Sequence, residues 1–141
     1  MKPTFNNIFI KAFRAQQSKI RPYMSSIGLT PGQPKILEFL ASNNHCMQKD
    51  LACACDIEPA TVSSLLNNME REGLIERTSI KGNKRALSIS ITDKGREYHE
   101  KMQIHFREVN AMALIGFTDE EKKQLSKYLC RIYMNLTGME I

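Results

Sequence analysis

The segment from Pro59 to Arg71 combines an apolar stripe with an outer face of short polar side chains. The stripe consists of Val62, Leu65, Leu66 and Met69, whose spacing predicts an amphipathic helix. The other face is small or polar, with almost no acid before Glu70, and comprises Pro59, Ala60, Thr61, Ser63, Ser64, Asn67, Asn68 and Arg71. A solvated helix usually carries Glu and Lys there. Short hydroxyl and amide groups instead suit hydrogen bonding to base edges in the major groove of double-stranded DNA.

A second candidate group lies between Arg77 and Arg85, where four basic residues occur without an acidic one. Two β-like runs, 74–78 and 86–91, flank this segment and predict a hairpin with its tip at residues 81–85. We expect Lys81 and Lys84 to contact phosphates, which position a protein without specifying sequence. Arg85 is placed to enter a minor groove, because narrow A·T-rich grooves attract arginine. A solvated charged face remains the alternative interpretation.

The elements around these residues occur in a recognisable order. A short helix is expected over residues 48–55 and a turn over 56–58, before the helix that Pro59 starts. Gly73 is expected to end that helix in the left-handed conformation, ahead of the hairpin. A helix, a tight turn, a second helix and a β-hairpin together predict a winged helix-turn-helix, whose second helix enters the major groove.

Helices are also expected on both sides of this unit. Phe5, Ile8, Phe9 and Phe13 recur at helical spacing and predict a helix from about Thr4 to Met24. Three further helices are expected, the first beginning with Thr30 as N-cap and Pro31 as first helical residue, the second capped by Thr92 and the third by Thr118. The predicted fold class is mainly α with a small β-wing, in which the outer helices hold two copies of the unit together.

The length and composition indicate one globular domain, and its basic net charge favours a polyanionic partner. The chain has 141 residues, a net charge of +5 and a pI of about 9.1. Residues 1–37 contain six basic side chains and no acidic one. No leader-like apolar segment follows Met1, and no apolar run approaches the roughly 18 residues of a membrane span. We therefore expect a soluble, cytoplasmic protein without membrane contact.

The four cysteines, Cys46, Cys53, Cys55 and Cys130, leave a thiol- or metal-responsive regulator of the same fold as an alternative. Without a secretory leader they are expected to be reduced thiols. Cys53 and Cys55 lie two residues apart on a predicted helix, so their side chains point about 200° apart and cannot share a ligand unless the helix unwinds. We predict no metal site and no cofactor.

Two other function classes agree less well with the sequence. His45, His99 and His105 are scattered, and neither a nucleophile–base pair nor a phosphate loop is recognisable, which argues against an enzyme. A winged helix that binds protein rather than DNA is the other alternative. The acid-poor outer face and the basic hairpin argue against it.

Taken together, these segments resemble the MarR family of bacterial transcriptional regulators, and the resemblance covers nearly the whole chain. The matching segments are residues 29–31 (LTP), 48–52 (QKDLA), 59–63 (PATVS), 69–75 (MEREGLI) and 91–95 (ITDKG). No single motif decides the match, but their order and spacing together make it strong. The resemblance implies a single MarR-type domain over residues 1–141. Within it, residues of about 30–92 form the winged helix-turn-helix, and 4–25 and 93–137 form dimerisation helices.

The resemblance also implies a function, and the chain departs from the family pattern at two places. It implies a homodimeric repressor that binds a palindromic operator and is released by a small-molecule effector bound between the dimerisation helices and the winged region. Where the family's wing carries Asp-x-Arg, this chain has Asn83, Lys84 and Arg85, so Asn83 would support Arg85 without charge assistance. Ser64 stands where the family often has an arginine that reads guanine.

Overall fold

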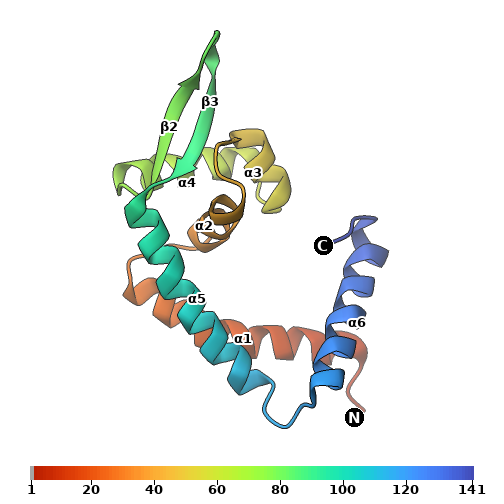
Figure 1. The fold of residues 1–141 in the computed structure, drawn as a ribbon. Helices are drawn as coiled ribbons and strands as arrows, with labels where there is room; N and C mark the ends of the chain where they lie inside the picture. The colour runs from red at the N-terminus through yellow and green to blue at the C-terminus, as the bar shows by residue number, and fades with distance from the viewer. Residues whose placement is uncertain (1) are drawn as a thin grey trace. The chain divides into compact units, whose positions relative to one another are not determined.

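The computed structural model describes residues 2–141, except for the side chains of residues 83–85. The described residues form six helices and a small three-stranded sheet, which confirms the predicted fold class (Figure 1). In chain order the elements are α1 (Phe5–Ser26), α2 (Gln33–Ser42), β1 (Cys46–Met47), α3 (Gln48–Ala54), α4 (Pro59–Arg71), β2 (Ile75–Ile80), β3 (Asn83–Ile91), α5 (Asp93–Ala113) and α6 (Asp119–Thr137). They divide into two compact units, Met1–Arg107 and Glu108–Ile141.

The core of the first unit is built by α2, α3, α4 and the base of the hairpin. The predicted stripe of α4 is buried, with Val62, Leu66 and Met69 fully inaccessible and Leu65 8% exposed. Its partners in the same cluster include Ile36, Leu37, Leu40, Leu51, Leu74, Ile75 and Ile89. Each such aliphatic side chain contributes on the order of 1.5–3 kcal/mol when buried. The face of α4 opposite the stripe is thereby directed outward.

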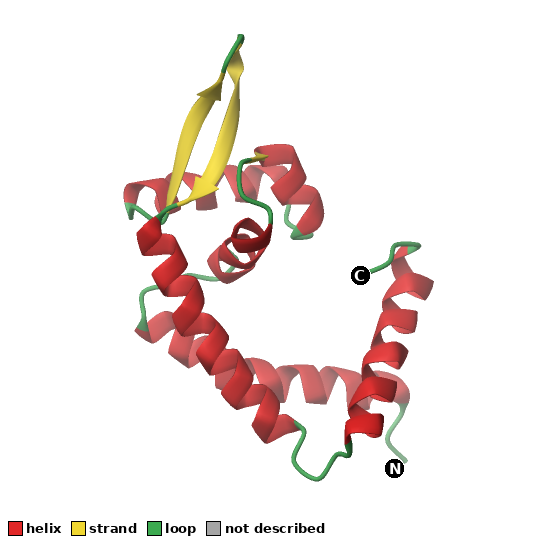
Figure 2. Ribbon diagram, in the orientation of Figure 1, coloured by secondary structure: helices red, strands yellow, loops and turns green. Residues whose placement is uncertain are grey.

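The sheet has the antiparallel order β1-β3-β2, and the β2–β3 hairpin projects beyond the helices of this unit (Figure 2). Strand β1 was not predicted; it pairs Cys46 with Ile89 and Met47 with Ser88. Strand β3 is therefore the central strand of the sheet, and its Ser90 is only 8% exposed.

The hairpin turn is also tighter than the predicted tip at residues 81–85. Only Lys81 and Gly82 form the turn, and Gly82 adopts φ +88°. The register shifts between Ser79 and Ile80, whose β3 partners are Leu87 and Asn83. The backbone of Asn83–Ile91 is strand, so residues 83–85 belong to β3 rather than to the turn.

The expected helix starts can be compared residue by residue. Thr118 caps α6 as predicted, and Thr4, near which the first helix was expected to start, caps α1; each accepts a hydrogen bond from the backbone N–H three residues on. The predicted start of α2 was wrong, because the helix begins at Gln33 with Gly32 as N-cap at φ 92°. The side chain of Gln33 does accept from the N–H of Thr30 at 3.0 Å, but it closes a turn that precedes the helix.

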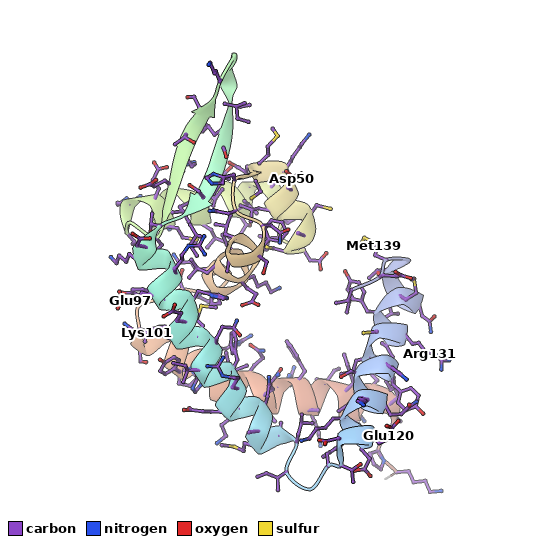
Figure 3. The ribbon with its side chains drawn as sticks, in the orientation of Figure 1. Asp50, Glu97, Lys101, Glu120, Arg131 and Met139 are labelled. Carbon is purple, nitrogen blue, oxygen red and sulfur yellow. The ribbon has the colours of Figure 1, made fainter. Side chains whose placement is uncertain are left out.

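Helix α5 is linked to α1 within the first unit. The Nε2 atom of His105 lies 2.9 Å from the carbonyl oxygen of Lys19, and the imidazole stacks on Tyr23 with ring centroids 4.2 Å apart. On the surface of α5, Glu97 and Lys101 form an ion pair of 3.3 Å (Figure 3). None of the helices among the described residues contains a stretch long and apolar enough to cross a bilayer.

Candidate nucleic-acid interface

Both ends of α4 are fixed by local sequence. Pro59 stands at the first helical position, where its missing N–H costs nothing and its φ is already helical. At the other end Gly73 adopts φ +76°, and its N–H donates to the carbonyl of Glu70. The N–H of Leu74 donates to the carbonyl of Met69 at 2.9 Å, which completes a Schellman motif. The helix therefore has a defined length and leads directly into β2.

A turn containing one left-handed residue sets α3 against α4. Asp56 adopts φ 52° between the two helices, and Asp50, labelled in Figure 3, accepts from the N–H of Met47 at the start of α3. Gln48 of α3 donates from Nε2 to the hydroxyl of Ser63 at 2.5 Å. The predicted site residue Ser63 is half-buried and already engaged with α3.

The outer face of α4 carries the remaining predicted residues. Six are exposed, namely Pro59, Ala60, Thr61, Ser64, Asn67 and Arg71, whereas Asn68 is half-buried. At 100° per residue, Ala60, Ser64, Asn67 and Arg71 lie within one narrow arc opposite the buried stripe. The helix thus presents two small side chains, one amide and one guanidinium along its most accessible line.

A three-residue contact links β2 to this outer face. Arg77 donates from Nε to Glu70 Oε2 at 2.7 Å and from an NH2 group to Asn67 Oδ1 at 2.8 Å. Its hydrogen bond to Glu70 holds the pKa of that carboxyl below its usual value. From the sequence, Arg77 was interpreted only as part of a basic run. One sequence signal could have revealed the contact. Asn67 and Glu70 are three residues apart on α4, and Arg77 follows on the next strand.

A second set of contacts joins the end of α4 to the junction of β3 and α5. Thr92 donates from its hydroxyl to the carbonyl of Gly73 at 2.6 Å and from its N–H to that of Leu74 at 3.1 Å. Lys94 Nζ donates to the carbonyl of Glu72 at 2.7 Å. Gly95 packs so closely that a Cβ built there would lie 2.2 Å from the carbonyl oxygen of Leu74. These contacts fix the hairpin relative to α4.

The hairpin carries the second group of predicted residues. Lys81 is exposed in the turn itself. The side chains of Asn83, Lys84 and Arg85 lie outside the described side chains, so their predicted phosphate and minor-groove contacts stay predictions. The hairpin and α4 belong to the same unit, and the hairpin extends away from the end at which α4 lies, as a winged helix-turn-helix requires (Figure 1).

The cysteines are spread over different environments. Burial, and secondarily the carboxylate of Asp50, raises the pKa of Cys46. Burial also raises the pKa of Cys55, whose thiol lies 3.6 Å from the carbonyl oxygen of Lys35. Cys53 and Cys130 are exposed. No group of three or more His, Cys, Asp or Glu side chains in the described part of the chain is placed to bind a metal ion.

An open hollow lies on the outer side of α3, beside the start of α4. It is lined by Gln48, Lys49, Ala52, Cys53, Ile57 and Pro59. This position differs from the one that the resemblance implies for an effector, between the dimerisation helices and the winged region. The hollow therefore gives no support to that expectation.

Comparison with known proteins identifies similar chains along most of the length. The model of the MarR family matches residues 29–87. The homoprotocatechuate degradative operon repressor of Escherichia coli is 31% identical over 121 residues, which cover 85% of this chain and 81% of that protein. The transcriptional repressor YetL of Bacillus subtilis is 30% identical over 82% of this chain and 70% of its own length. The solved MepR–DNA complex of S. aureus superimposes with a TM-score of 0.81 at 25% identity, over 94% of this chain and 98% of MepR.

Proposed function

The chain belongs to the MarR family of transcriptional regulators, and from this membership we propose that it is a homodimeric, sequence-specific repressor of a palindromic operator. The proposal assigns residues of about 30–92 to the winged helix-turn-helix. It assigns residues 4–25 and 93–137 to dimerisation. Release by a small-molecule effector is part of the same proposal.

The outer face of α4 is the observation that carries the proposal. Ala60, Ser64 and Asn67 combine exposure with short side chains, which lets a helix approach base edges closely. The N-terminal residues Pro59 and Thr61 are exposed on the same element, at the end that contacts bases in helix-turn-helix proteins. Ser63 and Asn68 flank this face, and Arg71 lies at its C-terminal end.

The wing supplies the complementary contacts. Lys81 and Lys84 bind phosphates and set the orientation of the protein, whereas Arg85, supported by Asn83, enters the minor groove. The S. aureus relative was solved as a DNA complex, which supports DNA as the partner of this fold. With two winged units in a dimer, the half-site centres lie about one helical turn, ~10 bp, apart.

Dimerisation explains the apolar side chains that the two terminal helices leave exposed. On α1, Phe5, Ile8, Phe9 and Phe13 are 64%, 54%, 44% and 54% exposed. On α6, Tyr128, Leu129 and Leu136 are 51%, 44% and 80% exposed, and the helix has no buried residue. Contiguous apolar surface of this kind marks protein contact sites.

The effector is proposed to be a small aromatic acid. Support comes from the E. coli relative, whose name records repression of a homoprotocatechuate degradative operon. Homoprotocatechuate is therefore the first probe. Adding it to the preformed complex at increasing concentration should release DNA, and a matched aliphatic acid should not. If neither compound, nor any other phenolic acid, lowers DNA affinity, the proposal that a small aromatic acid releases the protein from DNA is wrong.

Selection of DNA from a random pool, followed by footprinting of the selected duplex, tests the operator proposal. We expect a two-fold symmetric footprint with the stated half-site spacing. Lys84→Ala should weaken binding to all duplexes alike and flatten the salt dependence by about one unit for each phosphate that is no longer neutralised. Thr61→Ala should cost on the order of 1–3 kcal/mol at the selected site and less at random DNA. A short unsymmetrical footprint would contradict the dimeric geometry.

A further inference from the structure

Arg77 occupies an unusual position for a basic residue of a wing. It lies on β2, yet its guanidinium is directed to α4 and only 18% of its side chain is exposed. The two hydrogen bonds to Glu70 and Asn67, at 2.7 and 2.8 Å, use two arms of the same planar group. A guanidinium held this way by two neighbours is poorly placed to serve as a mobile phosphate contact.

The contact determines which way the Asn67 amide faces. A guanidinium only donates hydrogen bonds, so the amide atom that faces Arg77 must be the acceptor Oδ1. The Nδ2 amino group therefore lies on the opposite edge of the amide. Asn67 is exposed on the outer arc of α4, so this edge is the one available to a partner.

Glu70 stabilises this orientation of the Asn67 amide by holding Arg77 in place. It is three residues from Asn67, on the neighbouring position of the helix surface, and its carboxylate holds the guanidinium through Nε. Charge-assisted bonds of this type are roughly twice as strong as neutral ones. Without Arg77, the amide could rotate by half a turn at little cost and present either its oxygen or its nitrogen outward.

We propose that Arg77 is a positioning residue for DNA recognition, which orients Asn67 so that this side chain offers a hydrogen-bond donor to base edges. The proposal rests on the proposed function. In the major groove the acceptors are N7 of purines, O6 of guanine and O4 of thymine, whereas cytosine presents the N4 donor. Asn67 thus discriminates against cytosine at one position of each half-site, and Arg77 sets that preference without touching DNA.

The test compares base preference in a set of variants. Duplexes carry each of the four base pairs in turn, placed symmetrically at every operator position, and affinity is measured for wild type, Arg77→Met and Arg77→Lys. Arg77→Met should reduce the discrimination against cytosine roughly fivefold per half-site, the value of about one net hydrogen bond. Arg77→Lys keeps the charge but not the fork, so its discrimination should fall similarly while binding to random DNA stays unchanged.

A double-mutant cycle and a matched control isolate the route through Asn67. In the Asn67→Ala background, Arg77→Met should change discrimination no further. Lys94→Met removes an equal charge and another hydrogen bond to the end of α4, at the carbonyl of Glu72, but touches no side chain of the outer face. It should leave base preference intact. Melting temperatures of all variants show whether a loss reflects unfolding.

Each outcome bears on one of the two proposals. If Arg77→Met lowers affinity for every duplex equally, or acts equally in the Asn67→Ala background, Arg77 is not a positioning residue. If wild type binds all duplexes alike, the proposed function fails instead. The orientation itself is tested without DNA, by ¹⁵N NMR of the Arg77 NH2 group that donates to Asn67 Oδ1. We expect a slowly exchanging signal that shifts in Asn67→Ala, and rapid exchange in wild type would overturn the proposal.

Discussion

Substitution of Gly95 by alanine should destabilise the junction that holds the hairpin against α4. A Cβ at this position would lie 2.2 Å from the carbonyl oxygen of Leu74 and 2.7 Å from a side-chain carbon of Ile91. Real Cβ atoms essentially never approach closer than 3.0 Å, so the backbone must separate by about 0.8 Å. The same carbonyl accepts the hydrogen bond from Thr92, which the separation would lengthen from 3.1 Å.

The size of the effect follows from the nature of the obstacle. Forcing a carbon atom into a packed site costs about 1–3 kcal/mol, and a backbone carbonyl cannot rotate away as a side chain can. Alanine regains at most about 1 kcal/mol through its better helix propensity near the start of α5. The net loss of up to about 2 kcal/mol should lower the melting temperature by up to about 8 °C in a chain of this size.

Thermal unfolding followed by circular dichroism, at one fixed protein concentration, measures the change. The matched control is Gly28→Ala, where φ is +87° and no atom lies within 4 Å of the added Cβ. That variant bears only the left-handed strain of about 1–2 kcal/mol and should keep its DNA affinity below the melting range. Gly95→Ala, in contrast, should lose DNA affinity even below its melting range, because the hairpin moves relative to α4. If it melts and binds like wild type, the close approach to Leu74 does not constrain the junction.

Three further outcomes are expected. Phe9→Asp or Phe13→Asp should yield monomers in sedimentation at micromolar concentration, because each variant adds a charge to an apolar surface. If both variants remain dimers, the assignment of α1 to the dimer interface is wrong. Alkylation at neutral pH should modify Cys53 and Cys130 first and Cys55 last, since burial raises the pKa of Cys55; uniform rates would be inconsistent with its packing. The folded pKa of Glu70 lies below its usual 4.5, so its contribution to stability is present above that pH and is lost as the pH falls through the lowered pKa. NMR titration should show that pKa rising in Arg77→Met, and an unchanged value would remove Arg77 as its cause.

The features that local sequence determines were predicted correctly. The apolar stripe of α4 and the left-handed Gly73 depend on periodicity and on one helix-ending residue, and both are present. The capping residue Thr118 is likewise a local signal. In each case the interacting groups lie within one or two helical turns of each other in the sequence.

The features that were missed depend on contacts between distant segments. Strand β1 has two residues, too few for alternation to be visible, and exists only because β3 pairs with it. The late start of helix α2 is the exception, because the groups involved, Thr30, Gly32 and Gln33, lie close together in the sequence. The contact between Arg77 and Asn67 spans ten residues across two elements, and a pattern search along one helix cannot detect it.

The central claim is that this chain reads DNA sequence as a symmetric dimer, and its most direct test is a salt-dependent affinity titration. Wild-type protein is titrated onto the selected palindrome and onto a scrambled duplex of equal length and composition at several salt concentrations. We expect log affinity to fall linearly with log salt on both duplexes, with the palindrome bound about 10³-fold or more tightly at physiological salt. Equal affinity for the two duplexes, or binding that is independent of salt, would contradict the claim.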